Sequence, residues 1–108
     1  MTTNRYMEQM HEIVLSNNRL RDGAMVGRAM RAVKTLKKLD LSNNEMADLR
    51  QGSFVDVVSL EHLDLSKNRL TELKRSALHR LPRLKTVDLS HNQIRSFHSD
   101  SFKDTPQV

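Results

Sequence analysis

The 108-residue chain contains no cysteine and no tryptophan, and it has only one tyrosine and three phenylalanines. The absence of cysteine excludes a disulfide framework, a thiol nucleophile and any thiolate metal site. No stretch approaches the roughly 20 apolar residues that a transmembrane helix needs, and residues 1–15 contain no apolar run long enough for a signal peptide. At 37% apolar residues, the composition is on the low side for an ordinary globular core.

What the sequence does contain is a repeat of 24 residues. Its copies begin LKKLDLSNNEMADL at Leu36, LEHLDLSKNRLTEL at Leu60 and LKTVDLSHNQIRSF at Leu84. Counted from the first leucine, large apolar residues recur at positions 1, 4, 6, 11, 14 and 19, and asparagine recurs at position 9. A period of this length indicates stacked units, each of which buries its apolar face against its neighbours.

A more divergent copy precedes these three. Its residues in the apolar and asparagine columns are Met10, Ile13, Leu15, Asn18 and Leu20. This copy has 26 residues, and we place the two extra ones between Leu20 and Met25, which assigns positions 14, 19 and 22 to Met25, Met30 and Val33. The helix-like spacing of apolar residues in AMVGRAMRAVKTL predicts a short helix in this copy.

The segment LEHLDLSKNRL, residues 60–70, follows the pattern LxxLxLxxNxL, and residues 10–108 resemble the leucine-rich repeat family over four copies. The repeat length, with phenylalanine or leucine at position 19, is similar to that of animal extracellular and receptor proteins. The resemblance implies an α/β solenoid, an arc with short parallel strands at positions 4 to 6 on its concave side and irregular or 3₁₀ segments on its convex side.

We therefore expect a leucine-rich repeat domain at residues 10–108, preceded at 1–9 by a tail or the remnant of another unit. Its units are 10–35, 36–59, 60–83 and 84–107, and Val108 starts a further unit. Because extracellular relatives close their solenoids with cysteine-stapled caps, we expect a fragment that lacks its caps and could self-associate through the uncapped ends. The resemblance suggests an extracellular or cell-surface location for the full-length protein, although this chain has no signal peptide and no cysteine.

The asparagine column is predicted to be structural. An asparagine where the chain turns off the strand can pair backbone groups with both its N–H and its carbonyl oxygen. The four residues in this ladder are Asn18, Asn44, Asn68 and Asn92.

Positions 3, 5, 7 and 8 point outward from the strands, and we expect the functional site on the face that they form. The resemblance implies that this face binds a protein ligand or co-receptor, as in receptor or adhesion ectodomains, and that no cofactor is needed. The residues that we expect to contact the partner are Lys38, Asp40, His62, Asp64, Lys67, Thr86, Asp88 and His91.

The stacked aspartates of position 5, Asp40, Asp64 and Asp88, lie about 5 Å apart in this register, so we expect at least one raised carboxyl pKa. They are solvated acids with a serine hydrogen bond, or they contact a basic partner, or they hold a metal with His62. Residues two apart on a strand are near 7 Å apart, too wide for converging ligands, so we expect no metal. The same columns lack an oxyanion hole and a nucleophile elbow, and we expect no enzyme.

Two other functions remain open: a structural spacer within a larger protein, or binding of a polyanion by the basic convex side. The net charge is +5, and much of the excess lies in two clusters. No aromatic residues interleave with them as base-stacking platforms, so we expect no nucleic acid partner. The clusters comprise Arg28, Arg31, Lys34, Lys37 and Lys38, and Lys74, Arg75, Arg80, Arg83 and Lys85.

Overall fold

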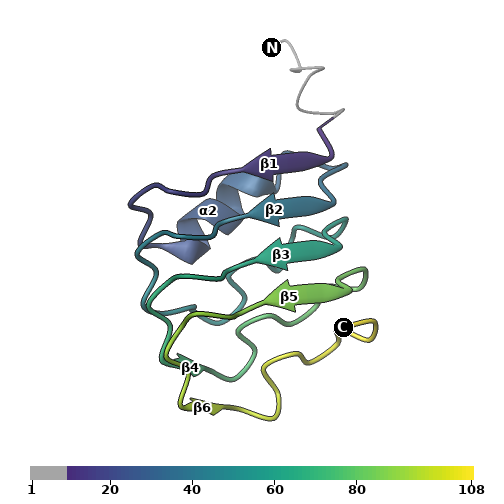
Figure 1. The fold of residues 1–108 in the computed structure, drawn as a ribbon. Coiled ribbons are helices and arrows are strands. Elements are labelled where there is room, and N and C mark those ends of the chain that lie inside the picture. The colour runs from purple at the N-terminus through teal and green to yellow at the C-terminus, as the bar shows by residue number, and fades with distance from the viewer. Residues whose placement is uncertain (1–9) are drawn as a thin grey trace.

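The computed structural model describes residues 10–108, and its centre is a four-stranded parallel sheet (Figure 1). Neighbouring strands pair at the same repeat position, so that Lys38 lies opposite His62 and His62 lies opposite Thr86. The tail or remnant expected at 1–9 lies outside the described residues. In spatial order, the strands are β1 (Glu12–Val14), β2 (Lys38–Asp40), β3 (His62–Asp64) and β5 (Thr86–Asp88).

The strands occupy repeat positions 3 to 5, one residue earlier than the expected positions 4 to 6. The leucine at position 6 still continues the ladder, because the Leu41 N–H donates to the Asp64 carbonyl and the Leu65 N–H to the Asp88 carbonyl, both at 2.8 Å. Parallel pairing over such short strands therefore extends beyond their formal ends.

The core consists of leucine layers stacked from one unit to the next. The position 1 leucines, Leu36, Leu60 and Leu84, are completely buried. At the ends of the described stack, Met10 and Phe97 are 38% and 70% exposed, although both were assigned to inward columns. Each lies in a terminal layer that has a described neighbour on one side only.

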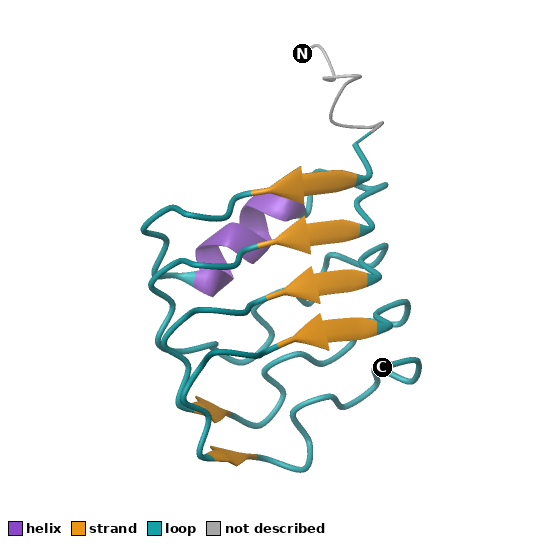
Figure 2. Ribbon diagram, viewed as in Figure 1, coloured by secondary structure: helices purple, strands orange, loops and turns teal. Residues whose placement is uncertain are grey.

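The return segments, residues 21–35, 47–59, 71–83 and 95–107, lead back to the next strand. The first contains α2 (Gly23–Met30), which confirms the predicted helix (Figure 2). The Asp22 side chain caps it by accepting from the Met25 N–H at 3.1 Å. The described part of the chain has no 3₁₀ helix; the other return segments form turns and a small parallel sheet, β4 (Glu72–Leu73) with β6 (Ser96–Phe97), which the sequence did not predict.

The placement of the two extra residues in the first unit was wrong. Met25, assigned to position 14, is 52% exposed. Gly23 is buried instead, and a Cβ on it would stand 2.9 Å from Cδ2 of Leu49, the position 14 residue of the next unit. The Val33 N–H donates to the Met30 carbonyl at 3.0 Å, as the Val57 N–H does to Phe54 in the second unit and the Thr105 N–H does to Phe102 in the fourth. The extra residues therefore fall after Gly23, where the helix absorbs them.

The asparagines join consecutive units. The Asn68 side-chain amide donates to the carbonyls of Leu65 and Ser66 in its own turn, at 3.0 and 3.1 Å, and to Leu41 of the preceding unit at 3.0 Å. Its carbonyl oxygen accepts from the Met46 N–H at 3.1 Å. One buried side chain thus pairs four backbone groups that the turn would leave unsatisfied.

Asn44 and Asn92 repeat this pattern in their own units. Asn18 differs, because among residues 10–108 its amide reaches only Leu15 and Ser16 of its own turn, at 2.9 and 3.2 Å. Within the described residues, the ladder therefore contains three asparagines that join two units and one, Asn18, that does not.

We expect Asn68→Ala to lower the free energy of unfolding by about 3 kcal/mol or more, since it leaves several buried backbone groups unpaired. Asn18→Ala is the matched control and should cost about 1 kcal/mol, because it breaks only local bonds at an exposed turn. Urea denaturation of both variants measures the difference. Equal losses would show that the links between units contribute nothing.

A second expectation concerns Gly27, which is buried on α2. Alanine normally stabilises a helix interior by about 1 kcal/mol relative to glycine. A Cβ at Gly27, however, would stand 1.8 Å from the Ser53 backbone oxygen. Gly27→Ala should therefore destabilise the protein by about 2 kcal/mol or more in the same denaturation experiment, and a stabilised variant would contradict this close packing of α2 on the second return segment.

Candidate functional site

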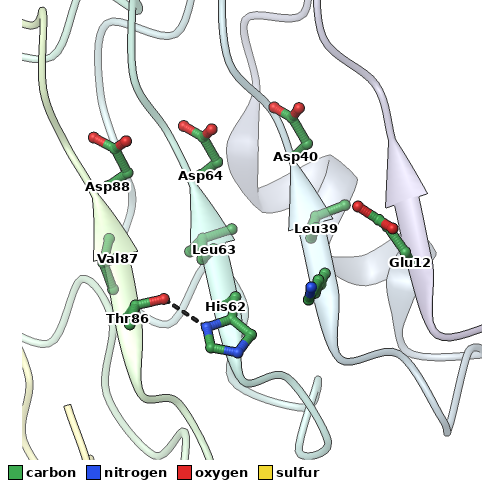
Figure 3. Close-up of a pocket in the computed structure, with 10 residues that line it drawn as sticks. Glu12, Leu39, Asp40, His62, Leu63, Asp64, Thr86, Val87 and Asp88 are labelled. Carbon is green, nitrogen blue, oxygen red and sulfur yellow. Dashed lines mark hydrogen bonds between the residues drawn. The ribbon is translucent and has the colours of Figure 1, made fainter.

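The outward face of the four-stranded sheet is hollowed by a groove of about 490 Å³, the sheet groove. Residues at repeat positions 3 to 5 of all four strands line it (Figure 3). Its lining comprises Glu12, Lys38, Leu39, Asp40, His62, Leu63, Asp64, Thr86, Val87 and Asp88.

The groove brings together six of the eight residues named from the sequence: Lys38, Asp40, His62, Asp64, Thr86 and Asp88. The other two, Lys67 and His91, are exposed but do not line it.

These two residues have left-handed backbones, each with φ of 56°. The first two units place Asn17 and Asn43 at the same position, with φ of 60° and 53°. Asparagine tolerates this conformation better than most residues. Repeat position 8 is therefore a turn position beyond the groove, and the turn geometry separates its side chains from those of positions 3 and 5.

Glu12 lines the groove but was left out of the expected contact residues. It occupies position 3 of the divergent first unit, opposite Lys38 in the sheet. Its place in the position 3 column is enough to identify Glu12 from the sequence. It was omitted because the divergent first unit was given too little weight.

The aspartate column is held by local hydrogen bonds. Oδ1 of Asp64 accepts from the N–H and hydroxyl of Ser66 at 2.9 and 2.6 Å, and Asp88 accepts equally from Ser90. Figure 3 shows the three carboxylates of Asp40, Asp64 and Asp88 pointing the same way from adjacent strands. The serine interpretation of this column is thus the one that the contacts support.

The expected rise in carboxyl pKa is contradicted at Asp88. The hydroxyl and amide hydrogen bonds from Ser90 lower the pKa of the Asp88 carboxyl below its ordinary value. Hydrogen bonds to the charged form outweigh like-charge repulsion at Asp88, because water solvates this exposed carboxylate while Ser90 donates at close range.

Two side chains on adjacent strands interact at the other edge of the groove. Nδ1 of His62 lies 2.7 Å from Oγ1 of Thr86 on the adjacent strand (Figure 3). This contact orients the imidazole along the sheet. The groove thus contains two rows of side chains. Lys38, His62 and Thr86 form one row, and the second row consists of the carboxylates of the aspartate column.

Two cations of the second basic cluster, Lys74 and Lys85, are already paired. Lys74 lies 2.9 Å from Asp48, which raises the pKa of the Lys74 ammonium. Lys85 lies 3.2 Å from Glu61 and lowers the pKa of that carboxyl. Exposed pairs of this kind contribute little stability, but they neutralise part of the second basic cluster.

Within residues 10–108, no group of three or more His, Cys, Asp or Glu side chains is arranged to hold a metal ion. The helix of the described chain is also too short and too polar to cross a membrane.

Comparison with known protein families identifies the repeat. The model of a family described as leucine rich repeat matches residues 8–70, 34–94 and 59–108. The chain belongs to the leucine-rich repeat family. Leucine-rich repeats have a solenoid-like fold and commonly act as non-enzymatic modules for protein–protein interaction. No curated protein matches the chain.

The lowered pKa of Asp88 has a testable origin. We expect Ser90→Ala to raise the Asp88 pKa toward its ordinary value of 3.8, because the hydroxyl donor to the charged form is lost while the backbone N–H remains. A carboxyl ¹³C titration measures it, with Ser66→Ala as a control that leaves Asp88 unchanged. Since the folded pKa is depressed, the stabilisation from Asp88 is present above the unfolded pKa and is lost as pH falls through the folded pKa. An unchanged Asp88 pKa in Ser90→Ala would contradict this account.

Proposed function

We propose that this leucine-rich repeat chain binds a protein partner in the sheet groove, which forms the concave face of an arc. The groove carries this proposal because it is a hollow of about 490 Å³ whose side chains are presented in register by adjacent strands. Side chains on paired strands are held at fixed spacing, so little conformational entropy is lost on binding.

The chemistry of the two rows suggests how the partner is recognised. Asp40, Asp64 and Asp88 present a column of exposed or half-buried carboxylates, and serine hydrogen bonds already orient them. Lys38 and the His62–Thr86 pair offer a cation and polar groups about two residues away along the strands. A partner with cations facing the carboxylates and acceptors facing the other row would be complementary to the groove.

The role proposed for this binding is that of a receptor or adhesion protein, the type of leucine-rich repeat protein that the repeat length resembles. In that setting Lys67 and His91 extend the contact surface beyond the groove, at the left-handed turns. Their exposure makes them rim residues, which typically affect association rate more than affinity.

A charge-reversed groove tests the proposal. A photo-crosslinking residue at Thr86 first identifies the partner, and its affinity is then measured for Asp64→Arg combined with His62→Glu. We expect a loss of about tenfold or more, because like charges would meet across the interface.

The matched control is Glu72→Arg combined with Ser96→Glu, which makes the same charge change on the paired strands β4 and β6. Its affinity should stay within about twofold of the original, as expected for a surface outside the interface. If the groove variant binds as well as the control, recognition by this face is ruled out.

A further inference from the structure

A second hollow, of about 350 Å³, lies on the return side, away from the sheet groove. We call it the return-side pocket and use five of its lining residues: Ser76, His79, Arg80, Lys103 and Asp104. Three consecutive return segments contribute to its walls, since Gln51 and Arg75 also line it.

Backbone contacts between these segments hold the pocket together. The Arg80 N–H donates to the Lys103 carbonyl at 2.9 Å, and the Gly52 N–H donates to the Ser76 carbonyl at 2.8 Å. Gly52 has φ of +68°, and a Cβ on it would stand 3.3 Å from Nε2 of His79. Glycine therefore provides both the left-handed turn and the space for the imidazole.

The charges of the pocket are unbalanced. Three cations, Arg75, Arg80 and Lys103, line it against one carboxylate, Asp104. Arg75 makes only a long ion pair, 3.6 Å to Asp100, and no side-chain hydrogen bond or ion pair within residues 10–108 occupies Arg80, Lys103 or His79. This differs from Lys74 and Lys85, whose charges neighbouring carboxylates neutralise.

The pocket also contains hydrogen-bonding groups without a protein partner. Ser76 is only 5% exposed, and its hydroxyl makes no hydrogen bond to any described residue. A guanidinium fork, an ammonium, an imidazole and a hydroxyl are the donors that sulfate and phosphate groups accept from. The hollow of about 350 Å³ has room for one such group.

From this combination we propose that the return-side pocket binds a tetrahedral oxyanion, a sulfate or phosphate group, through Arg80, Lys103, His79 and Ser76. The site is independent of the sheet groove and of its protein partner. The sequence left open polyanion binding by the whole basic convex side, whereas this proposal assigns anion binding to one pocket on that side.

The test is a ¹⁵N NMR titration of the whole chain with sodium sulfate, and separately with a sulfated heparin hexasaccharide. The largest shifts are expected at the amides of Ser76, His79 and Lys103. Tighter binding of the hexasaccharide would identify an ester on a polyanion as the source, and equal binding would identify a free anion; either supports the site. Shifts spread evenly over all the exposed cations would overturn it.

Variants with matched charge loss sharpen this test. Arg80→Ser with Lys103→Ser should weaken binding about tenfold or more, since charge-assisted hydrogen bonds are lost. Arg28→Ser with Lys34→Ser removes the same charges from the exposed surface of the first return segment and should change binding less than twofold. Equal weakening by both variants would overturn the proposal in favour of diffuse attraction.

Asp104→Asn tests the same site in the opposite direction. Asparagine keeps the size of the side chain and tolerates the φ of 57° at this position. Removing the one carboxylate of the lining should tighten sulfate binding about threefold. Unchanged or weaker binding, with an unaltered circular dichroism spectrum, would count against the pocket.

Discussion

The structure depends on the hydrogen bonds that each repeated asparagine makes to its own turn and to the preceding unit. A chain that leaves a buried strand must turn, and the turn exposes backbone carbonyls to an interior without water. The side-chain amide of Asn68 satisfies carbonyls in two consecutive units at once. Leucine layers alone would allow units to slide, whereas this directional link fixes one register.

That register determines what the surface can do. Because equivalent positions pair across strands, any residue that recurs in the repeat becomes a column, and the aspartates and their serines form one. The carboxylates are pre-oriented by bonds within their own unit, so they are available to a partner without rearrangement. In the proposed function, specific recognition depends on the positions where the columns differ, such as Lys38, His62 and Thr86.

The return side does not present repeated columns of side chains. Its segments are joined by turns and a two-stranded sheet, and their exposed residues vary from unit to unit. Variation breaks the columns, so a group of side chains such as Arg80, Lys103 and His79 occurs once. A unique pocket is therefore more readily built on this side than on the repetitive strand face.

Sequence reasoning was most successful where a physical period controls the structure. The parallel strands and the helix of the first unit both follow from apolar spacing. It failed where the geometry at a single position decides. Position 14 of the first unit was assigned to Met25 instead of Gly23, because spacing cannot show which residue packs against Leu49. Charge stacking was expected to raise the pKa of at least one of the stacked aspartates, whereas the pKa of Asp88 is lowered, because Ser90 donates to its carboxylate at close range.

By itself, the sequence determined the family, the repeat register and the side chains that share the strand face, because a 24-residue period specifies equivalent positions without coordinates. Only the tertiary structure decided that Lys67 and His91 lie beyond the groove and that Arg80, Lys103 and His79 meet in one pocket. The reason is that backbone dihedrals and the packing of return segments depend on contacts between units, and a one-dimensional pattern does not contain those contacts.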